Sequence, residues 1–114
     1  MQLNDTLKMA MNVSDKFREK LGNKFDYSEI SDVVDDSSHR AFKIRFTAYN
    51  YFIVLFNYDL DRIGCSLEYG EYHISLSNSQ KWYSDADLDV FCNELMDELE
   101  LRIPDKFLEA HGWK

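Results

Sequence analysis

The stretch 51–58 (YFIVLFNY) constrains the fold more than any other, because it is apolar at both odd and even positions. A strand with one face in water alternates apolar and polar residues. We therefore expect this stretch to be a strand with both faces covered, in the middle of a sheet.

Segments on both sides of this stretch alternate apolar and polar residues, as half-buried strands do. They are residues 42–48, 62–68 and 71–77. Only two or three residues separate successive segments, so we expect consecutive hairpins that form a meander of antiparallel strands.

The short turns also predict strand registers. A two-residue turn at Tyr49-Asn50 pairs Ala48 with Tyr51, and the second sheet face then carries an apolar stripe of Phe52, Val54 and Phe56. A helix or a partner protein would cover that stripe.

The next hairpin has its own predicted register. A two-residue turn at Tyr69-Gly70 pairs Leu67 with Tyr72 and Cys65 with Ile74, and these apolar pairs would lie on one face. Glu68 then faces Glu71, which costs some stability unless the turn is wider.

Apolar residues at three- and four-residue spacing predict two long helices. The first spans about 5–21, capped by Asn4 or Asp5 and ended at Gly22-Asn23. Its apolar stripe, which also includes one serine, consists of Leu3, Leu7, Ala10, Met11, Ser14, Phe17 and Leu21.

The second helix spans about 85–102, with Ser84 as the predicted cap and Asp87 in a capping-box position. Its apolar stripe consists of Leu88, Phe91, Cys92, Leu95, Met96, Leu99 and Ile103. Pro104 ends this helix, and a short last helix stops at Gly112.

The element order predicts a single α+β domain over residues 1–114. Its antiparallel meander sheet has four to five strands, flanked by an N-terminal helix, a long helix in the C-terminal region and a short last helix. Residues 24–36 change alternation phase partway along, which predicts a bulged edge strand or a strand broken by a turn.

Composition and charge narrow the class of protein. The net charge of −8 argues against binding to nucleic acid, which requires a basic footprint. No window is apolar enough for a membrane span, and the N-terminus lacks signal-peptide features. The two cysteines, Cys65 and Cys92, fit buried free thiols, so we expect a soluble cytoplasmic protein.

No motif for catalysis, cofactor or metal binding is present. His73 could lie near Ser66 and Ser75, but no nucleophile elbow accompanies them, so we expect no enzyme activity. Residues 85–96 resemble the start of a calcium loop, yet Val90 and Met96 replace the required glycine and glutamate.

Negative charge is concentrated in two segments. The first acidic run, residues 26–36, has five acids, and the second acidic run, residues 85–100, has seven; neither contains Lys or Arg. Such charge can steer a basic partner, and nearby aromatic residues can anchor it. The predicted partner-binding residues are Asp26, Tyr27, Glu29, Asp32, Asp35, Asp36, Trp82, Tyr83, Asp85, Asp87 and Asp89.

In size, α+β layout and acidic runs, the chain resembles the small acidic immunity proteins of bacterial toxin systems, such as contact-dependent growth inhibition. The resemblance implies tight binding to a basic toxin domain, often a nuclease, with acids in the places of substrate phosphates.

Other interpretations stay open. The acids could be solvated surfaces that keep a small protein soluble, or edge charges that prevent strand pairing. The chain could also be a phage or plasmid DNA mimic that disables a defence nuclease. A third alternative is an oligomeric structural protein that associates through Phe52, Val54 and Phe56.

Overall fold

The computed structural model describes residues 5–114, so the expectations for Leu3 and Asn4 lie outside the described residues. Its helices are α1 (Asp5–Leu21), α2 (Leu88–Glu100) and α3 (Asp105–Ala110), with short 3₁₀ turns η1 (Gly22–Lys24) and η2 (Tyr83–Asp85). Its strands are β1 (Phe25–Asp35), β2 (Arg40–Ala48), β3 (Phe52–Asp59), β4 (Arg62–Tyr69) and β5 (Tyr72–Ser75).

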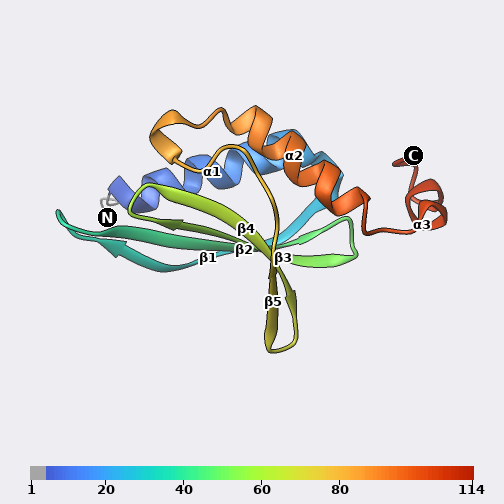
Figure 1. Ribbon diagram of the computed structural model, residues 1–114, viewed down its shortest axis with the longest axis horizontal. Helices are drawn as coiled ribbons and strands as arrows, with labels where there is room; N and C mark the ends of the chain where they lie inside the picture. Colours follow the sequence, from blue (N-terminus) through green and yellow to red (C-terminus); the bar gives the residue numbers. More distant parts are fainter. Residues whose placement is uncertain (1–4) are drawn as a thin grey trace.

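The predicted α+β meander is confirmed. The five strands are antiparallel and follow one another in the order β1-β2-β3-β4-β5, with β3 in the centre. Both long helices cover the same face of the sheet, and α3 lies beyond the end of α2 (Figure 1). No helix of the described residues lies on the other face of the sheet.

Phe17 of α1 is the centre of the hydrophobic core between helices and sheet. Its ring centroid lies 5.3 Å from those of Phe46 and Phe56 and 6.2 Å from that of Phe91 on α2. The helix bounds match the prediction, but its buried stripe includes Val13, whereas the predicted Met11 is exposed.

The predicted register between β2 and β3 is wrong by one residue. Ala48 pairs with Phe52, and the turn contains Tyr49, Asn50 and Tyr51. Tyr49 is fully buried, and its N–H donates to the carbonyl of Lys24 at 2.8 Å. The prediction placed a two-residue turn at Tyr49-Asn50. Because Tyr49 is buried, the turn has three residues instead.

This shift exchanges the two faces of β3, because side chains alternate along a strand. Phe52, Val54 and Phe56 lie in the core beneath the helices, while Ile53 and Leu55 lie on the helix-free face. The prediction that both faces are covered is therefore wrong. The chain's own helices cover the stripe proposed for self-association.

The predicted register between β4 and β5 is also wrong. The turn is Gly70-Glu71, and Leu67 pairs with Ile74. Gly70 has φ of +59°, a left-handed conformation that glycine adopts readily. The Glu68–Glu71 pair does not form, since Glu68 lies opposite His73 and accepts a 2.6 Å bond from Arg45 on β2.

The hairpin of β4 and β5 projects from the body of the molecule, away from the helices (Figure 1). Tyr72 and Ile74, predicted to face the core, are consequently exposed at 77% and 47%. The chain then returns along β4, where the N–H of Ile63 donates to the carbonyl of Lys81 at 2.9 Å.

The second helix begins later than predicted, because Asp87 rather than Ser84 caps it. The Asp87 carboxylate accepts from the N–H groups of Asp89 and Val90 at 2.9 and 3.3 Å. Ser84 instead donates its hydroxyl to Asp61 at 2.6 Å. The predicted apolar stripe of this helix is buried or half-buried throughout, and Pro104 precedes α3 as expected.

Replacing Asp87 with alanine is expected to lower the free energy of unfolding by about 1 kcal/mol, because two N–H groups of α2 lose their acceptor. Urea unfolding followed by circular dichroism measures the loss. Asp85→Ala is the matched control, since its carboxylate caps no helix and the charge change is the same. An equal loss in both variants would contradict the assignment of Asp87 as the cap.

Candidate functional site

The first acidic run lies on β1, which forms one edge of the sheet and is bulged as predicted. The register shifts between Asp26 and Glu29 and again between Ser31 and Val34. Tyr27 and Asp32, inside the two bulges, have φ values of 51° and 52°. Bulges twist an edge strand and interrupt its hydrogen-bonding row, which discourages pairing with another chain.

Several carboxylates of the first acidic run are bound by the protein's own groups. Asp32 pairs with Lys43 at 3.4 Å, and Asp35 lies 3.9 Å from Arg40. Asp36 accepts from the backbone and the hydroxyl of Ser38, and these bonds lower the pKa of Asp36.

Within residues 5–114, the Asp26 carboxylate accepts only from the backbone N–H of Tyr27, the next residue. Tyr27 is 80% exposed, and Glu29 makes no side-chain hydrogen bond or ion pair within residues 5–114. Among the described residues, the acids of this run that bind no other side chain, Asp26 and Glu29, therefore lie at the end of β1 that is nearer to η1.

The second acidic run extends from η2 to the end of α2 and is also partly neutralised. Asp89 pairs with Lys16 of α1 at 2.7 Å, which lowers the pKa of Asp89, and Asp87 is the helix cap. Glu98 pairs with Arg102 at 2.8 Å. Asp85 and Asp97 form no side-chain hydrogen bond or ion pair with the residues that the structure describes.

The two acidic runs do not form one surface. The first run is on β1 at one sheet edge, and α1 packs on β1 and β2, between that edge and α2. A bridge between Arg62 and Trp82 places Trp82 beside β4, near the opposite edge. Asp26, Tyr27, Glu29, Asp32, Asp35 and Asp36 therefore lie apart from Trp82, Asp85 and the acids of α2.

Trp82 and Tyr83 occupy different environments. Trp82 is 48% exposed, and the guanidinium carbon of Arg62 lies 5.7 Å from its ring centroid. Tyr83 is half-buried, with its ring 5.6 Å from that of Tyr58 in an edge-on arrangement. Of these two predicted anchors, only Trp82 offers a large exposed face.

A groove lies between the segment that follows β5 and the acids of α2. Residues 77–79, which follow β5, line a groove of about 410 Å³ together with Glu94, Asp97 and Glu98. The backbone N–H and the hydroxyl of Ser79 both donate to Glu94, the former at 2.6 Å. Trp82 and Asp85 line an adjoining pocket with Ser79.

We name the lining of these two hollows, together with the exposed side chains of the preceding strand β5, the β5-side surface. Its exposed apolar side chains and its acids are Tyr72, Ile74, Trp82, Asp85, Glu94, Asp97 and Glu98. Between residues 71 and 101 the sequence contains eight Asp or Glu and one Lys, Lys81. The sequence analysis did not identify Tyr72 and Ile74 as binding residues. Apolar and polar residues alternate around them as in a strand that faces the core, so they were predicted to be buried.

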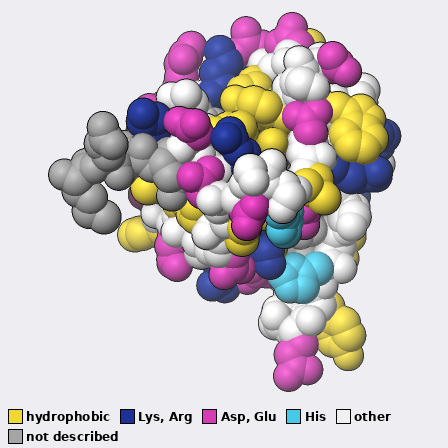
Figure 2. Space-filling model, turned by 90° about the vertical axis from the view of Figure 1, so that its left-hand side faces the viewer, with side chains coloured by type: hydrophobic (Ala, Val, Ile, Leu, Met, Phe, Trp, Pro, Cys, Tyr) yellow, Lys and Arg dark blue, Asp and Glu magenta, His cyan; other side chains and the backbone are white. Residues whose placement is uncertain are grey.

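The end of the molecule nearest the β3–β4 turn has a more mixed charge. Figure 2 shows Lys and Arg side chains interspersed among the carboxylates there, whereas the projecting hairpin below ends in hydrophobic and acidic side chains. His39 contacts Asp59 at 2.9 Å, and Arg40 lies 3.7 Å from Asp5. This end is therefore a weaker candidate for attracting a basic partner.

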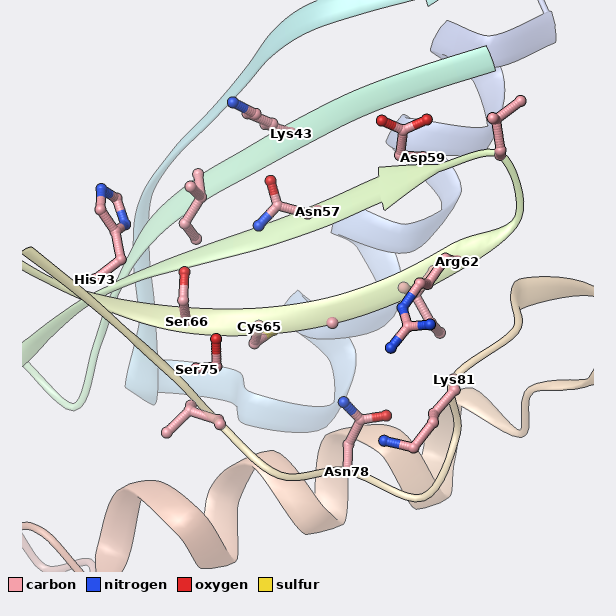
Figure 3. Close-up of a pocket in the computed structure, with 15 residues that line it drawn as sticks. Lys43, Asn57, Asp59, Arg62, Cys65, Ser66, His73, Ser75, Asn78 and Lys81 are labelled. Atoms are coloured by element: carbon pink, nitrogen blue, oxygen red, sulfur yellow. The ribbon is translucent and has the colours of Figure 1, made fainter. Parts of the chain in front are cut away.

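A polar cleft of about 910 Å³ lies on the helix-free face of the sheet. Ser66 and Ser75 are directly opposite in the register, and His73 lies at one end of the cleft (Figure 3). The lining also contains Lys43, Arg62 and Lys81.

The predicted proximity of His73 to the two serines is present, but it does not form a catalytic arrangement. Within residues 5–114, His73 makes no side-chain hydrogen bond to a serine or a carboxylate, which activation of a nucleophile requires. The cationic lining makes this cleft a poor place for a basic partner.

Three further results concern metal binding, membrane insertion and similarity to known proteins. Within the described residues, no group of three or more His, Cys, Asp or Glu side chains could hold a metal ion. No helix in that part of the chain is long and apolar enough to cross a bilayer. Comparison with protein-family models, curated proteins and solved structures finds no significant match.

Proposed function

We propose that the protein is a non-catalytic binding protein that holds a basic protein partner on its β5-side surface. The observation that carries this proposal is the combination of exposed Tyr72, Ile74 and Trp82 with the acids of α2 and η2. Asp85 and Asp97 are available for a partner's cations, because no described side chain pairs with them.

The chemistry of this surface fits protein recognition. Buried aromatic and aliphatic anchors contribute most of the affinity in protein interfaces, while surrounding charges determine association rate and partner choice. Here the anchors are on a hairpin and on a segment paired with β4, and the charges are on a rigid helix. We therefore assign affinity to the apolar residues and steering to the carboxylates.

The resemblance to bacterial immunity proteins gives this proposal a specific form. The partner would be a basic toxin domain, often a nuclease, and the bound protein would occlude its active site. Carboxylates of the β5-side surface would take the positions of substrate phosphates against the toxin's Lys and Arg. The first acidic run, including Asp26, Tyr27 and Glu29, has a protective role at the β1 edge in this proposal.

The test is calorimetric binding to the protein domain encoded beside this gene, measured from low to high salt. We expect that domain to be basic and its affinity to fall as salt rises, because salt screens exposed charges. The double variant Asp85→Asn, Asp97→Asn should bind about two- to thirty-fold more weakly at low salt, since each exposed pair contributes about 0.2–1 kcal/mol.

The matched control is the double variant Glu19→Gln, Glu29→Gln, which removes the same charge elsewhere on the molecule. None of these four acids makes a side-chain ion pair or hydrogen bond within residues 5–114. A neighbouring domain that does not bind would overturn the proposed function. Binding that is independent of salt would contradict the charge-led mechanism, and equal losses in both double variants would contradict its assignment to the β5-side surface.

A further inference from the structure

The outer edge of β5 offers unpaired backbone groups. β5 is the last strand of the sheet, and all four of its residues are exposed. The N–H of Leu76 donates to the carbonyl of Cys65 on β4 at 2.9 Å. Because successive backbone groups alternate in direction, those of Ile74 and Tyr72 also face β4, and those of His73 and Ser75 face outward.

The two edges of the sheet are built differently. β1 carries two bulges and four acids, all of which discourage strand pairing. β5 has no Pro, Lys or Arg, and its pairing with β4 is regular from Tyr69–Tyr72 to Ser66–Ser75. β1 is therefore the more strongly protected edge. β5 is short, with four residues, but its outward backbone groups can pair with an added strand.

The side chains around β5 specify what kind of strand would fit. Tyr69, Tyr72 and Ile74 share one face of the hairpin and are 45%, 77% and 47% exposed. Beyond Ser75 the chain enters the groove lined by Glu94, Asp97 and Glu98. An added strand would thus meet apolar side chains along β5 and carboxylates at its end.

We propose that β5 is a docking edge at which an extended, basic segment of the protein partner adds as a sixth strand. This inference rests on the proposed function and specifies how the partner is held. The segment's backbone bonds to His73 and Ser75, as in other cases of β-strand addition. Its alternate apolar residues cover Tyr72 and Ile74, and a Lys or Arg reaches the acids of α2.

A second copy of this chain is the competing occupant. Two copies would bring net charges of −8 together, and high net charge of one sign opposes self-association. A basic segment has the complementary charge, which is why we assign it to this edge. Light scattering of the protein alone should therefore give the mass of a monomer.

The experiment uses the full chain and the basic domain encoded beside its gene. Ser75→Pro removes an outward N–H while leaving the bonds between β5 and β4 in place, and proline is tolerated at strand edges. We expect this variant to bind about five- to ten-fold more weakly, through the loss of one backbone hydrogen bond. Ser75→Thr, which keeps the N–H, should bind as the unaltered protein does.

Substituting a charged residue for Ile74 provides a second measurement if proline distorts the hairpin. Ile74→Lys should weaken binding more than Ile74→Glu, because only lysine repels a basic segment. In hydrogen exchange, the amides of His73 and Ser75 should become protected when the domain is added.

Unchanged binding by Ser75→Pro and Ile74→Lys, with both amides unprotected, would overturn the docking edge while leaving the proposed function intact. Protection of these amides in the protein alone, together with a dimer mass, would assign the edge to a second copy and overturn the inference. Failure of the unaltered chain to bind overturns both proposals.

Discussion

Replacing Phe17 with alanine is expected to lower the free energy of unfolding by about 3–5 kcal/mol, the usual cost of truncating a buried phenylalanine. Phe17 is 1% exposed, and its ring packs against Phe25, Phe46, Phe56 and Phe91. These rings belong to β1, β2, β3 and α2, so one cavity would loosen both layers. Because domains are stable by only about 5–15 kcal/mol, the variant should be close to unfolding.

Urea unfolding monitored by tryptophan fluorescence provides the measurement. Met11→Ala on the same helix is the control, since Met11 is exposed and its truncation should change stability by about 0.5 kcal/mol or less. Phe17→Leu should fall between the two because it keeps most of the volume. A loss in Phe17→Ala no larger than that in Met11→Ala would contradict the central position of this ring.

The periodicity of the sequence predicted much of this core. Spacing placed Phe17 on the buried stripe of α1 and Phe91 on that of α2, and both are buried. Gly22 ended α1 with a φ of +59°, and the phase change after Tyr27 predicted the bulges of β1. These features depend on residues close together in the chain, so a local pattern is enough to predict them.

Strand register could not be predicted in the same way. The β2–β3 turn depends on Tyr49, which is buried because its ring and hydroxyl find partners far away in sequence. The hydroxyl donates to Glu100 at 2.7 Å, and the ring lies 5.3 Å from that of Trp113. An error of one residue then exchanged the faces of β3, since side chains alternate.

The candidate site could be predicted only in part. The sequence shows which segments are acidic and aromatic, but it does not show which of their side chains lie together. The sequence analysis identified Trp82 and Asp85 as binding residues, but it grouped them with the acids of β1. It assigned the other acids of α2 to the second acidic run, yet it named only Asp89 of that helix as a binding residue. Asp89 meets Lys16 across two helices, and Asp32 meets Lys43 across two strands. Such pairs depend on packing between elements, and they decide which carboxylates remain free for a partner.

Tyr72 and Ile74 illustrate a different difficulty. Their alternation correctly predicted a strand, yet burial depends on whether a second layer covers that strand. The hairpin of β4 and β5 projects away from the helices, so the apolar face of β5 is open (Figure 1). A pattern of two-residue period is consequently the same for a strand that faces the core and for a strand whose apolar face is exposed.

Between about pH 9 and pH 11, stability is expected to fall by about 5 kcal/mol, because two buried thiols keep their protons only in the folded chain. Burial raises the pKa of Cys92 from 9.0 to about 12, and burial also raises the pKa of Cys65. The unfolded chain therefore binds fewer protons above pH 9, and each thiol costs about 1.4 kcal/mol per pH unit.

Tyr49 extends the same effect to higher pH. Burial, followed by its hydrogen bond to Glu100, raises the pKa of Tyr49 above the ordinary tyrosine value of 10.0. Below about pH 10 the tyrosine is protonated in both the folded and the unfolded chain, and its contribution to stability is complete. Above about pH 10 the unfolded tyrosine loses its proton while the folded one keeps it, so this contribution is lost.

Urea unfolding at a series of alkaline pH values, with a reductant present, measures the predicted slope. The double variant Cys65→Ala, Cys92→Ala removes both thiols, so its stability should start lower, because core volume is lost, but change little between about pH 9 and pH 10. The tyrosines remain in this variant and should reproduce the fall above about pH 10. Equal slopes below that pH in both proteins would show that the thiols are not the groups responsible, and would place the titration elsewhere in the chain.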